Sequence, residues 1–244
     1  DQVDDRTSCV LVSSVLFGTG LIVPELQQIA AACTKHGAEM MVDAYHSLGV
    51  VPFSLDGMEQ AFVLGGGYKY MQLGEGNCFM RVPEGCEMRP VITGWFSEFA
   101  ELADAKTEGE VRYGKGFMRF SGSTFDPTSQ YRGAAVLDFF AEQGLSTELL
   151  RSVSQHQVGL LVETLESLDL DPAMVSIDAG VPLESRAGFL TVRAPDAEAL
   201  SVALREHGVS TDARGDRLRF GPAPYLSDAQ VVQAMETLRE VVPR

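Results

Sequence analysis

The first third of the chain alternates short apolar runs with glycine-containing breaks. Apolar, β-branched runs of this length are typical of buried strands, and the longer amphipathic stretch between two of them is typical of a helix. We predict strands at residues 8–17, 39–42, 61–64 and 77–82, and a helix over 25–35 that ends at Gly37. A strand–helix–strand unit with this spacing has parallel strands. The pattern therefore predicts an α/β fold with a mostly parallel sheet and flanking helices.

Residues 84–127 lack a sustained period and are rich in glycine, glutamate and aromatic residues. They are too apolar for a disordered tether, so we predict an irregular, functional connection. Helical patterns follow over 129–143 and 147–168, and beyond residue 171 the pattern becomes a compact α+β one. Its predicted strands lie near 175–177, 189–192 and 217–220, and its predicted helices cover 196–207 and 227–241, the second with Ser227 as N-cap.

These changes of pattern predict three parts. Residues 1–145 form the larger domain, or the C-terminal part of one. Residues 146–170 form a connecting helix, and residues 171–244 form a small C-terminal α+β domain.

Composition excludes several classes of function. The 244 residues carry a formal charge of −15, which argues against binding to nucleic acid or to an anionic membrane surface, because both need clustered Lys and Arg. No apolar run reaches the roughly 18 residues of a membrane span. The four cysteines show no CxxC spacing, and the four histidines are scattered, so a zinc site is not expected. We expect buried free thiols, including Cys9 and Cys33, and a reducing cytoplasmic setting.

An acid and an amine end two of the predicted strands. Asp43 ends one apolar run, and Lys69 follows another after three glycines, 69 − 43 = 26 residues later. The carboxyl ends of parallel strands meet at one edge of a sheet, where open α/β folds bind ligands. Pyridoxal phosphate (PLP) chemistry needs an amine that can form a Schiff base and an acid that keeps the pyridine nitrogen protonated. Alone, Asp43 could be a turn residue, and Lys69 could simply reach solvent.

The glycines at 65–67 favour a functional site. They remove side-chain bulk where a cofactor or another backbone approaches closely, and they weaken the strand. A loss of strand stability of this kind is expected at a functional site rather than in an ordinary hydrophobic core.

Four segments resemble the kynureninase branch of the class V, fold type I PLP enzymes. They contain an acid-x-x-His motif, a Tyr-Lys pair, a Gly-Trp motif and an Arg-Phe-Gly…Pro segment, in the order of that family, at residues 42–56, 61–70, 89–99 and 218–226. The resemblance runs from about Ser8 to the C-terminus. It implies PLP as cofactor and part of a fold type I large domain followed by the small C-terminal domain.

The resemblance also implies roles for individual residues. Lys69 would be the Schiff-base lysine and proton shuttle, Asp43 the partner of the pyridinium nitrogen, and His46 a neighbour of the ring. Arg219 would grip the substrate α-carboxylate. The other implied cofactor contacts are Tyr68, which would also assist proton transfer, Ser13, and Trp95 and Thr124, which would reach the cofactor phosphate of a neighbouring subunit.

Each of these residues also has an ordinary structural explanation. His46 and Trp95 could be core residues, and Arg219 could form an ion pair with Asp212 or Asp216. Ser13 and Thr124 could be caps at strand ends and turns.

The reaction that the resemblance implies is hydrolytic Cβ–Cγ cleavage of L-kynurenine to anthranilate and alanine. The cofactor and fold do not fix the reaction, so a class V aminotransferase, desulfurase or epimerase, or a non-catalytic subunit with a PLP fold, stays open. Residues 72–77 and 96–98 depart from the family pattern, as does the apolar segment 15–18, where the family has a polar stretch. These departures bear on the substrate more than on the cofactor.

Two partners are implied by the resemblance. The roles of Trp95 and Thr124 imply a homodimer with shared active sites. Members of the family begin with a long segment that supplies a phosphate loop and an aromatic residue stacked on the ring. Because this chain starts directly before a predicted mid-sheet strand, we expect it to be a piece of a longer polypeptide.

Overall fold

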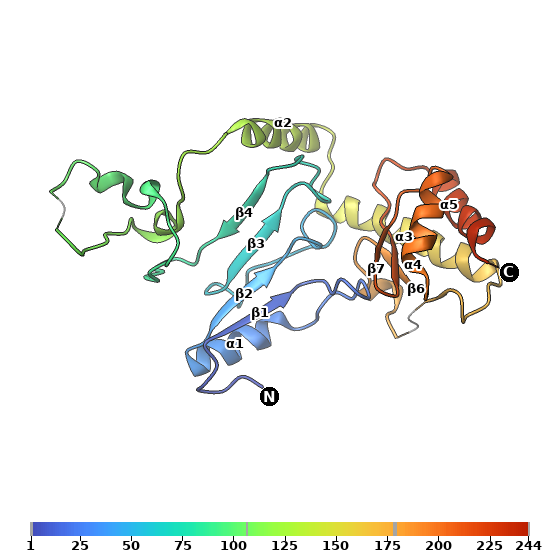
Figure 1. Cartoon of the computed structure of the whole chain (residues 1–244), viewed down its shortest axis with the longest axis horizontal. Helices are drawn as coiled ribbons and strands as arrows, with labels where there is room; N and C mark the ends of the chain where they lie inside the picture. Colours follow the sequence, from blue (N-terminus) through green and yellow to red (C-terminus); the bar gives the residue numbers. More distant parts are fainter. Residues whose placement is uncertain (1, 106, 178–179, 244) are drawn as a thin grey trace.

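The computed structural model describes residues 2–105, 107–177 and 180–243, and they form two sheets with separate cores (Figure 1). The first sheet contains β1 (Cys9–Ser13), β2 (Glu39–Asp43), β3 (Phe62–Gly66) and β4 (Cys78–Arg81) in sequence order. Helix α1 (Leu26–His36) joins β1 to β2. β1, β2 and β3 are mutually parallel, and β4 returns antiparallel to β3. The predicted mostly parallel sheet is confirmed.

The sequence of the first unit explains why it folds in this way. The buried side of α1 carries Leu26, Ala30 and Cys33, which pack with the buried residues Met40 and Val42 of β2. Gly37 ends the helix in the left-handed conformation at φ +67°, and its N–H bonds to the last carbonyls of the helix.

The prediction that the first strand is buried is wrong. β1 is shorter than predicted and forms an edge of the sheet. Leu11 is 68% exposed, and Cys9 is exposed rather than a buried thiol. The physical reason is that α1 covers one face of the sheet, and β1 has a strand partner on only one side. Cys33 is buried, as predicted.

An irregular segment leads away from β4 to the far end of the molecule from the C-terminal domain (Figure 1). It contains two 3-10 helices, η1 (Trp95–Glu101) and η2 (Gly116–Phe120), and then returns to α2 (Thr128–Glu142). α2 packs on the turn before β4, because Arg132 Nε donates to the carbonyl of Leu73 and Asn77 donates to the carbonyl of Ser129. The prediction of an irregular connection is confirmed.

The C-terminal sheet has the order β5-β6-β8-β7 and is antiparallel throughout. Its side chains alternate. Leu190, Val192, Leu218 and Phe220 point into the core, whereas Arg219 belongs to the opposite face. The strands are β5 (Ser176–Ile177), β6 (Leu190–Arg193), β7 (Asp212–Arg214) and β8 (Arg217–Phe220). The helices are α3 (Thr147–Ser167), the 3-10 helix η3 (Leu183–Ser185), α4 (Ala197–Glu206) and α5 (Asp228–Val241).

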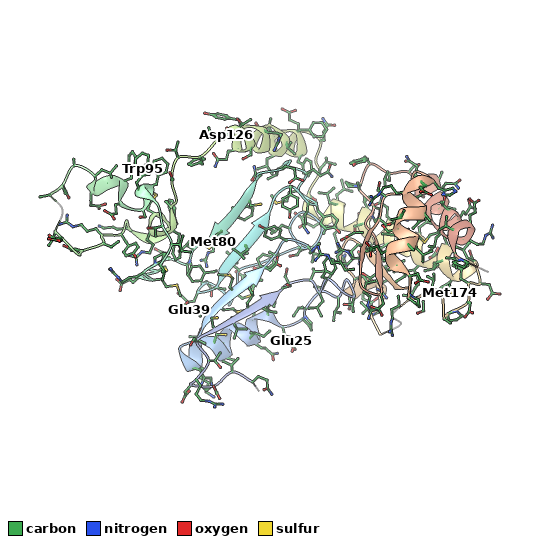
Figure 2. The ribbon with its side chains drawn as sticks, in the orientation of Figure 1. Glu25, Glu39, Met80, Trp95, Asp126 and Met174 are labelled. Carbon is green, nitrogen blue, oxygen red and sulfur yellow. The ribbon has the colours of Figure 1, made fainter. Side chains whose placement is uncertain are left out.

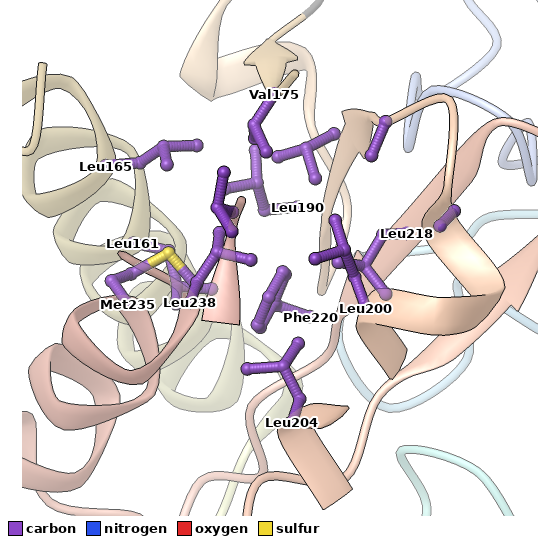
Figure 3. Packing of buried hydrophobic residues seen from close by; sticks show 14 of the residues in the cluster. Leu161, Leu165, Val175, Leu190, Leu200, Leu204, Leu218, Phe220, Met235 and Leu238 are labelled. Atoms are coloured by element: carbon purple, nitrogen blue, oxygen red, sulfur yellow. The ribbon is translucent and has the colours of Figure 1, made fainter. Parts of the chain in front are cut away.

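The core of this C-terminal part is larger than the core of the first sheet (Figure 3). Leu161 and Leu165 of α3 and Met235 and Leu238 of α5 pack against the apolar face of the sheet. α3 therefore shares its core with the C-terminal sheet. The exact domain boundaries at 145/146 and 170/171 stay a prediction. No helix in the described ranges is long and apolar enough to cross a membrane.

Candidate active site

Asp43 lies at the carboxyl edge of the first sheet, where the structure fixes its carboxylate. The parallel register places it beside Ser13 on β1 and beside Leu64 on β3. Asp43 Oδ1 accepts a hydrogen bond from the backbone N–H of Tyr45 at 2.9 Å, and Oδ2 accepts one from Ser13 Oγ at 3.4 Å. Ser13 therefore contacts the acid, and the acid is oriented before any ligand arrives.

Lys69 follows β3 in a tight turn. Its N–H bonds to the carbonyl of Gly66, and its own carbonyl accepts from the N–H of Gln72. The turn directs the side chain back toward the motif that contains Asp43, so that Nζ lies 3.0 Å from His46 Nε2. Nζ also lies 5.9 Å from the ring centre of Tyr45 and 5.8 Å from that of Tyr68. The amine thus stands among one imidazole and two phenol rings.

Electrostatics favour the neutral forms of both bases. Burial lowers the pKa of Lys69, Arg219 lowers it further, and Asp43 opposes the shift. Burial and the charge of Lys69 lower the pKa of His46 to about 4. At neutral pH His46 is therefore uncharged and can accept a hydrogen bond from Lys69 through Nε2. A larger fraction of Lys69 is a free amine than at an exposed lysine, which suits a nucleophile.

Arg219 reaches the same place from the C-terminal sheet. It lies opposite Asp212 in the β7–β8 register, and the two side chains form an ion pair. Its guanidinium stacks on Phe17, with Cζ 3.4 Å from the ring centre, and lies 5.2 Å from the ring centre of Phe189. The ion pair that the sequence offered as a structural explanation is present, yet Arg219 also faces Lys69.

A cleft of about 680 Å³ joins these groups. It lies between the two sheets, because residues of the β3 turn and residues of β8 line it together. Its lining includes His46, Tyr68, Lys69, Phe189, Asp212 and Arg219. The structure therefore brings together the amine, the histidine and the arginine predicted from three separate segments.

The residues present fit a PLP-type cofactor. Within the described ranges, His46 Nδ1 and Arg219 Nε are buried polar atoms without a hydrogen-bond partner. Unpaired buried donors are costly, and a ligand with anionic or carbonyl oxygens would satisfy them. The fixed carboxylate of Asp43 lies close enough to act on the charge of both Lys69 and His46.

The three glycines have a partly different role from the predicted one. A Cβ at Gly65 would clash with the ring of Phe79, and one at Gly66 with the ring of Tyr45. At Gly67 a Cβ would lie 2.9 Å from the carbonyl oxygen of Asn77. Close approach of another backbone occurs only at Gly67. The other two glycines make room for aromatic side chains of the chain itself.

Trp95 and Thr124 are not part of this cleft. Trp95 lies in the segment at the far end of the molecule, and Thr124 is exposed in the same segment (Figure 2). Their two motifs do contact each other. The N–H of Gly94 donates to the carbonyl of Ser121, and a Cβ at Gly94 would clash with the backbone of Gly122. The Gly-Trp motif and the segment around Thr124, which were both predicted to contact the cofactor phosphate of a neighbouring subunit, are therefore in contact with each other.

Several aromatic residues at the site were not predicted from the sequence. Phe189 lines the cleft, and Phe17 and Tyr45 adjoin it. In the sequence, Phe17 belongs only to an apolar segment that departs from the family pattern, and Tyr45 occupies an unspecified position of the acid-x-x-His motif. Phe17 lies 6.0 Å from His46, centre to centre, and stacks on Arg219. The available signal was an aromatic residue inside a motif whose other members were already assigned.

Comparisons with known proteins agree with the geometry. Residues 150–238 match the family model for the kynureninase C-terminal domain. Kynureninase of Pseudomonas fluorescens is 28% identical over 249 residues, and kynureninase of Burkholderia mallei (strain SAVP1) is 27% identical over 247. Both alignments cover 99% of this chain and 58% of the relative. The chain therefore spans less than two thirds of the length of these curated relatives.

Solved structures show the same fold. Cysteine desulfurase from Thermococcus onnurineus NA1 matches with a TM-score of 0.77 at 17% identity, covering 96% of this chain and 60% of that one. The cystine C-S lyase C-DES, solved with cysteine persulfide, matches with a TM-score of 0.77 at 21% identity, covering 98% and 63%. The predicted architecture, part of a fold type I large domain plus a small C-terminal α+β domain, is confirmed. The chain is similar over nearly its whole length to the kynureninase-like branch of the class V PLP enzymes, as its motifs indicated.

Proposed function

We propose that this chain forms the Lys69 side of a PLP-dependent active site of the kynureninase type. The proposed reaction is hydrolysis of the Cβ–Cγ bond of L-kynurenine, in which one water is consumed and anthranilate and alanine are released. The observation that carries the proposal is the convergence of Lys69, His46 and Arg219 on one cleft beside the fixed carboxylate of Asp43. The similarity to kynureninases over 99% of the chain supports the choice of substrate.

Each residue of the cleft has a task in this proposal. When bound, PLP supplies an electron sink that stabilises negative charge at the substrate α-carbon. Lys69 would hold the cofactor through its amine and would move a proton at the substrate α-carbon. Asp43 would keep the pyridine nitrogen protonated, and Arg219 would orient the substrate through its α-carboxylate. Tyr68, in the wall of the cleft, moves a proton near Lys69 or donates to the cofactor phosphate.

The homodimer belongs to the same proposal. Trp95 and Thr124 are remote from Lys69 of their own chain but lie in paired, exposed motifs. A two-fold partner would bring them to its cofactor phosphate. We also propose a reducing, cytoplasmic setting, which the four free cysteines support.

The test is reductive trapping. Purified protein is incubated with PLP, reduced with borohydride and digested, and the peptides are mapped by mass. We expect the pyridoxyl mass on the peptide containing Lys69, and none in the Lys69→Ala variant. A label elsewhere, or no label, would contradict the proposal. Product analysis with kynurenine, and with alanine or cysteine as alternative amino donors, then distinguishes hydrolysis from transamination or desulfuration.

A further inference from the structure

Tyr45 adjoins the cleft beside Asp43 and Lys69, and it has no task in the proposed function. Its backbone N–H holds the carboxylate of Asp43, and its ring centre lies 5.9 Å from Lys69 Nζ. The ring also meets that of Tyr68 edge to face, at 6.0 Å between centres. Tyr45 therefore borders the acid through its backbone and the amine through its side chain.

Two contacts fix the ring in this position. It lies directly over Gly66, where a Cβ would clash with it. The side chain of Cys78 beside its hydroxyl, together with burial, raises the pKa of Tyr45 to about 12. The phenol is neutral at neutral pH and is no candidate for a general base. The ring of Tyr45 instead presents a flat apolar face next to Asp43 and Lys69.

We propose that Tyr45 is a positioning residue whose ring packs against the pyridine ring of the cofactor and holds it between Asp43 and Lys69. The inference rests on the proposed function, because it requires PLP at this site. A planar ring that reaches from the carboxylate of Asp43 to the amine of Lys69 would therefore pass beside Tyr45. Aromatic rings in such contact attract each other in offset or edge-to-face arrangements beyond their burial.

The direct test is the affinity of the full chain for PLP, measured from the absorbance of the lysine-bound cofactor. Tyr45→Ala removes the ring and should raise the dissociation constant about 3- to 10-fold. Tyr45→Phe keeps the ring and loses only the hydroxyl, so its affinity should stay within about twofold of the wild type. An unchanged dissociation constant in Tyr45→Ala would overturn the inference, as would an equal loss in both variants.

Two adjacent glycines provide a matched pair of variants that leave Tyr45 itself in place. Gly66→Ala pushes the ring of Tyr45 aside, whereas Gly65→Ala pushes Phe79, a 43% exposed ring on the other face of β3. Neither glycine has a positive φ, so the backbone accepts alanine at both positions. We expect Gly66→Ala to weaken PLP binding as Tyr45→Ala does, and Gly65→Ala to leave it unchanged. Equal losses of PLP affinity in Gly65→Ala and Gly66→Ala would show that the effect comes from the strand β3 and not from the position of Tyr45.

The failure of this inference differs from failure of the proposed function. If the wild-type protein traps no cofactor on Lys69, the proposed function and the role of Tyr45 are both wrong. If the wild type traps cofactor and Tyr45→Ala binds it equally well, only the role of Tyr45 is wrong, and the assignment of Lys69 is retained.

Discussion

At the scale of single residues, the site depends on keeping one imidazole uncharged beside an amine. His46 Nε2 lies 3.0 Å from Lys69 Nζ, and the side chain is half-buried. A second positive charge at this distance would repel the first and would lose its hydration. The pair therefore links the chemistry of the site to the stability of the fold.

This link predicts how stability depends on pH. The pKa of His46 is about 4 in the folded state, below its ordinary value of 6.5, so the unfolded state binds the proton more readily. His46 therefore makes the free energy of unfolding fall as pH drops from 6.5 toward 4. In His46→Gln, the loss between pH 7 and pH 4.5, measured by urea unfolding, should be smaller by on the order of 1–2 kcal/mol, after allowance for partial exposure. Equal losses in the variant and the wild type would contradict this.

Phe17 yields a second prediction at this scale. Its ring stacks on the guanidinium of Arg219 at 3.4 Å, and Arg214 lies 4.3 Å from the same ring centre. Phe17→Leu keeps an apolar side chain but loses the cation–π contact, worth about 0.5–2 kcal/mol. We expect KM for an amino-acid substrate to rise about 3- to 10-fold with kcat nearly unchanged. Phe17→Tyr, which retains the ring, is the control, and a fall in kcat at constant KM would show that Phe17 does not act through Arg219.

Residue types at strand ends made much of this site predictable. Asp43 and Lys69 follow apolar runs, and a parallel sheet necessarily brings such ends to one edge. The stacking of Arg219 on Phe17 depends on how the two sheets meet, which no local pattern contains. The ion pair of Arg219 with Asp212, which the sequence offered as an alternative, forms within the C-terminal sheet. The role of Gly65 and Gly66 could not be predicted, because the rings beside them come from Phe79 on β4 and from Tyr45 after β2.

At the scale of elements, the helices were the easiest to predict, because their signals are local. α5 begins with a capping box. Ser227 Oγ accepts from the N–H of Gln230, and the Gln230 side chain accepts from the N–H of Ser227. The predicted helix starts at this cap, one residue before α5 itself. β7 was missed because its three residues, Asp212–Arg214, are polar and follow no apolar alternation. The position of β1 was predicted, but its exposure was not, because an apolar run does not reveal whether a second layer of the structure covers the strand.

The capping box gives a prediction about α5. Ser227→Ala removes the acceptor for the N–H of Gln230 and should lower the free energy of unfolding by about 1 kcal/mol. α5 contributes Met235 and Leu238 to the larger core, so the loss should appear in the unfolding of the C-terminal part. Ser152→Ala is the control, because that exposed hydroxyl donates to the carbonyl of Leu149 within its own helix, α3. Equal effects of the two substitutions would show that the cap contributes nothing specific.

At the scale of the whole molecule, the apolar surface is unevenly distributed. Val91 is 99% exposed and Ile92 91% exposed, both in the segment that carries Trp95. Further exposed rings of this segment and of α2 include Phe99, Phe117, Phe125 and Tyr131. A concentration of exposed apolar side chains in one segment is typical of an interaction site. The same segment holds the two motifs that the proposed function assigns to the site of a partner.

Mixing two inactive variants tests that assignment without an activity assay. Lys69→Ala cannot be labelled by borohydride trapping, and Trp95→Ala should trap cofactor weakly if its partner also lacks Trp95. In a mixed dimer, the Trp95→Ala chain keeps Lys69 and receives an intact Trp95 from the Lys69→Ala chain. After denaturation and refolding of an equal mixture, half of the dimers are mixed, and each has one intact site of two, so labelling should recover to about a quarter of the wild-type level. If Trp95 instead served its own chain, every Trp95→Ala chain would carry the defect whatever its partner, and mixing would restore no label.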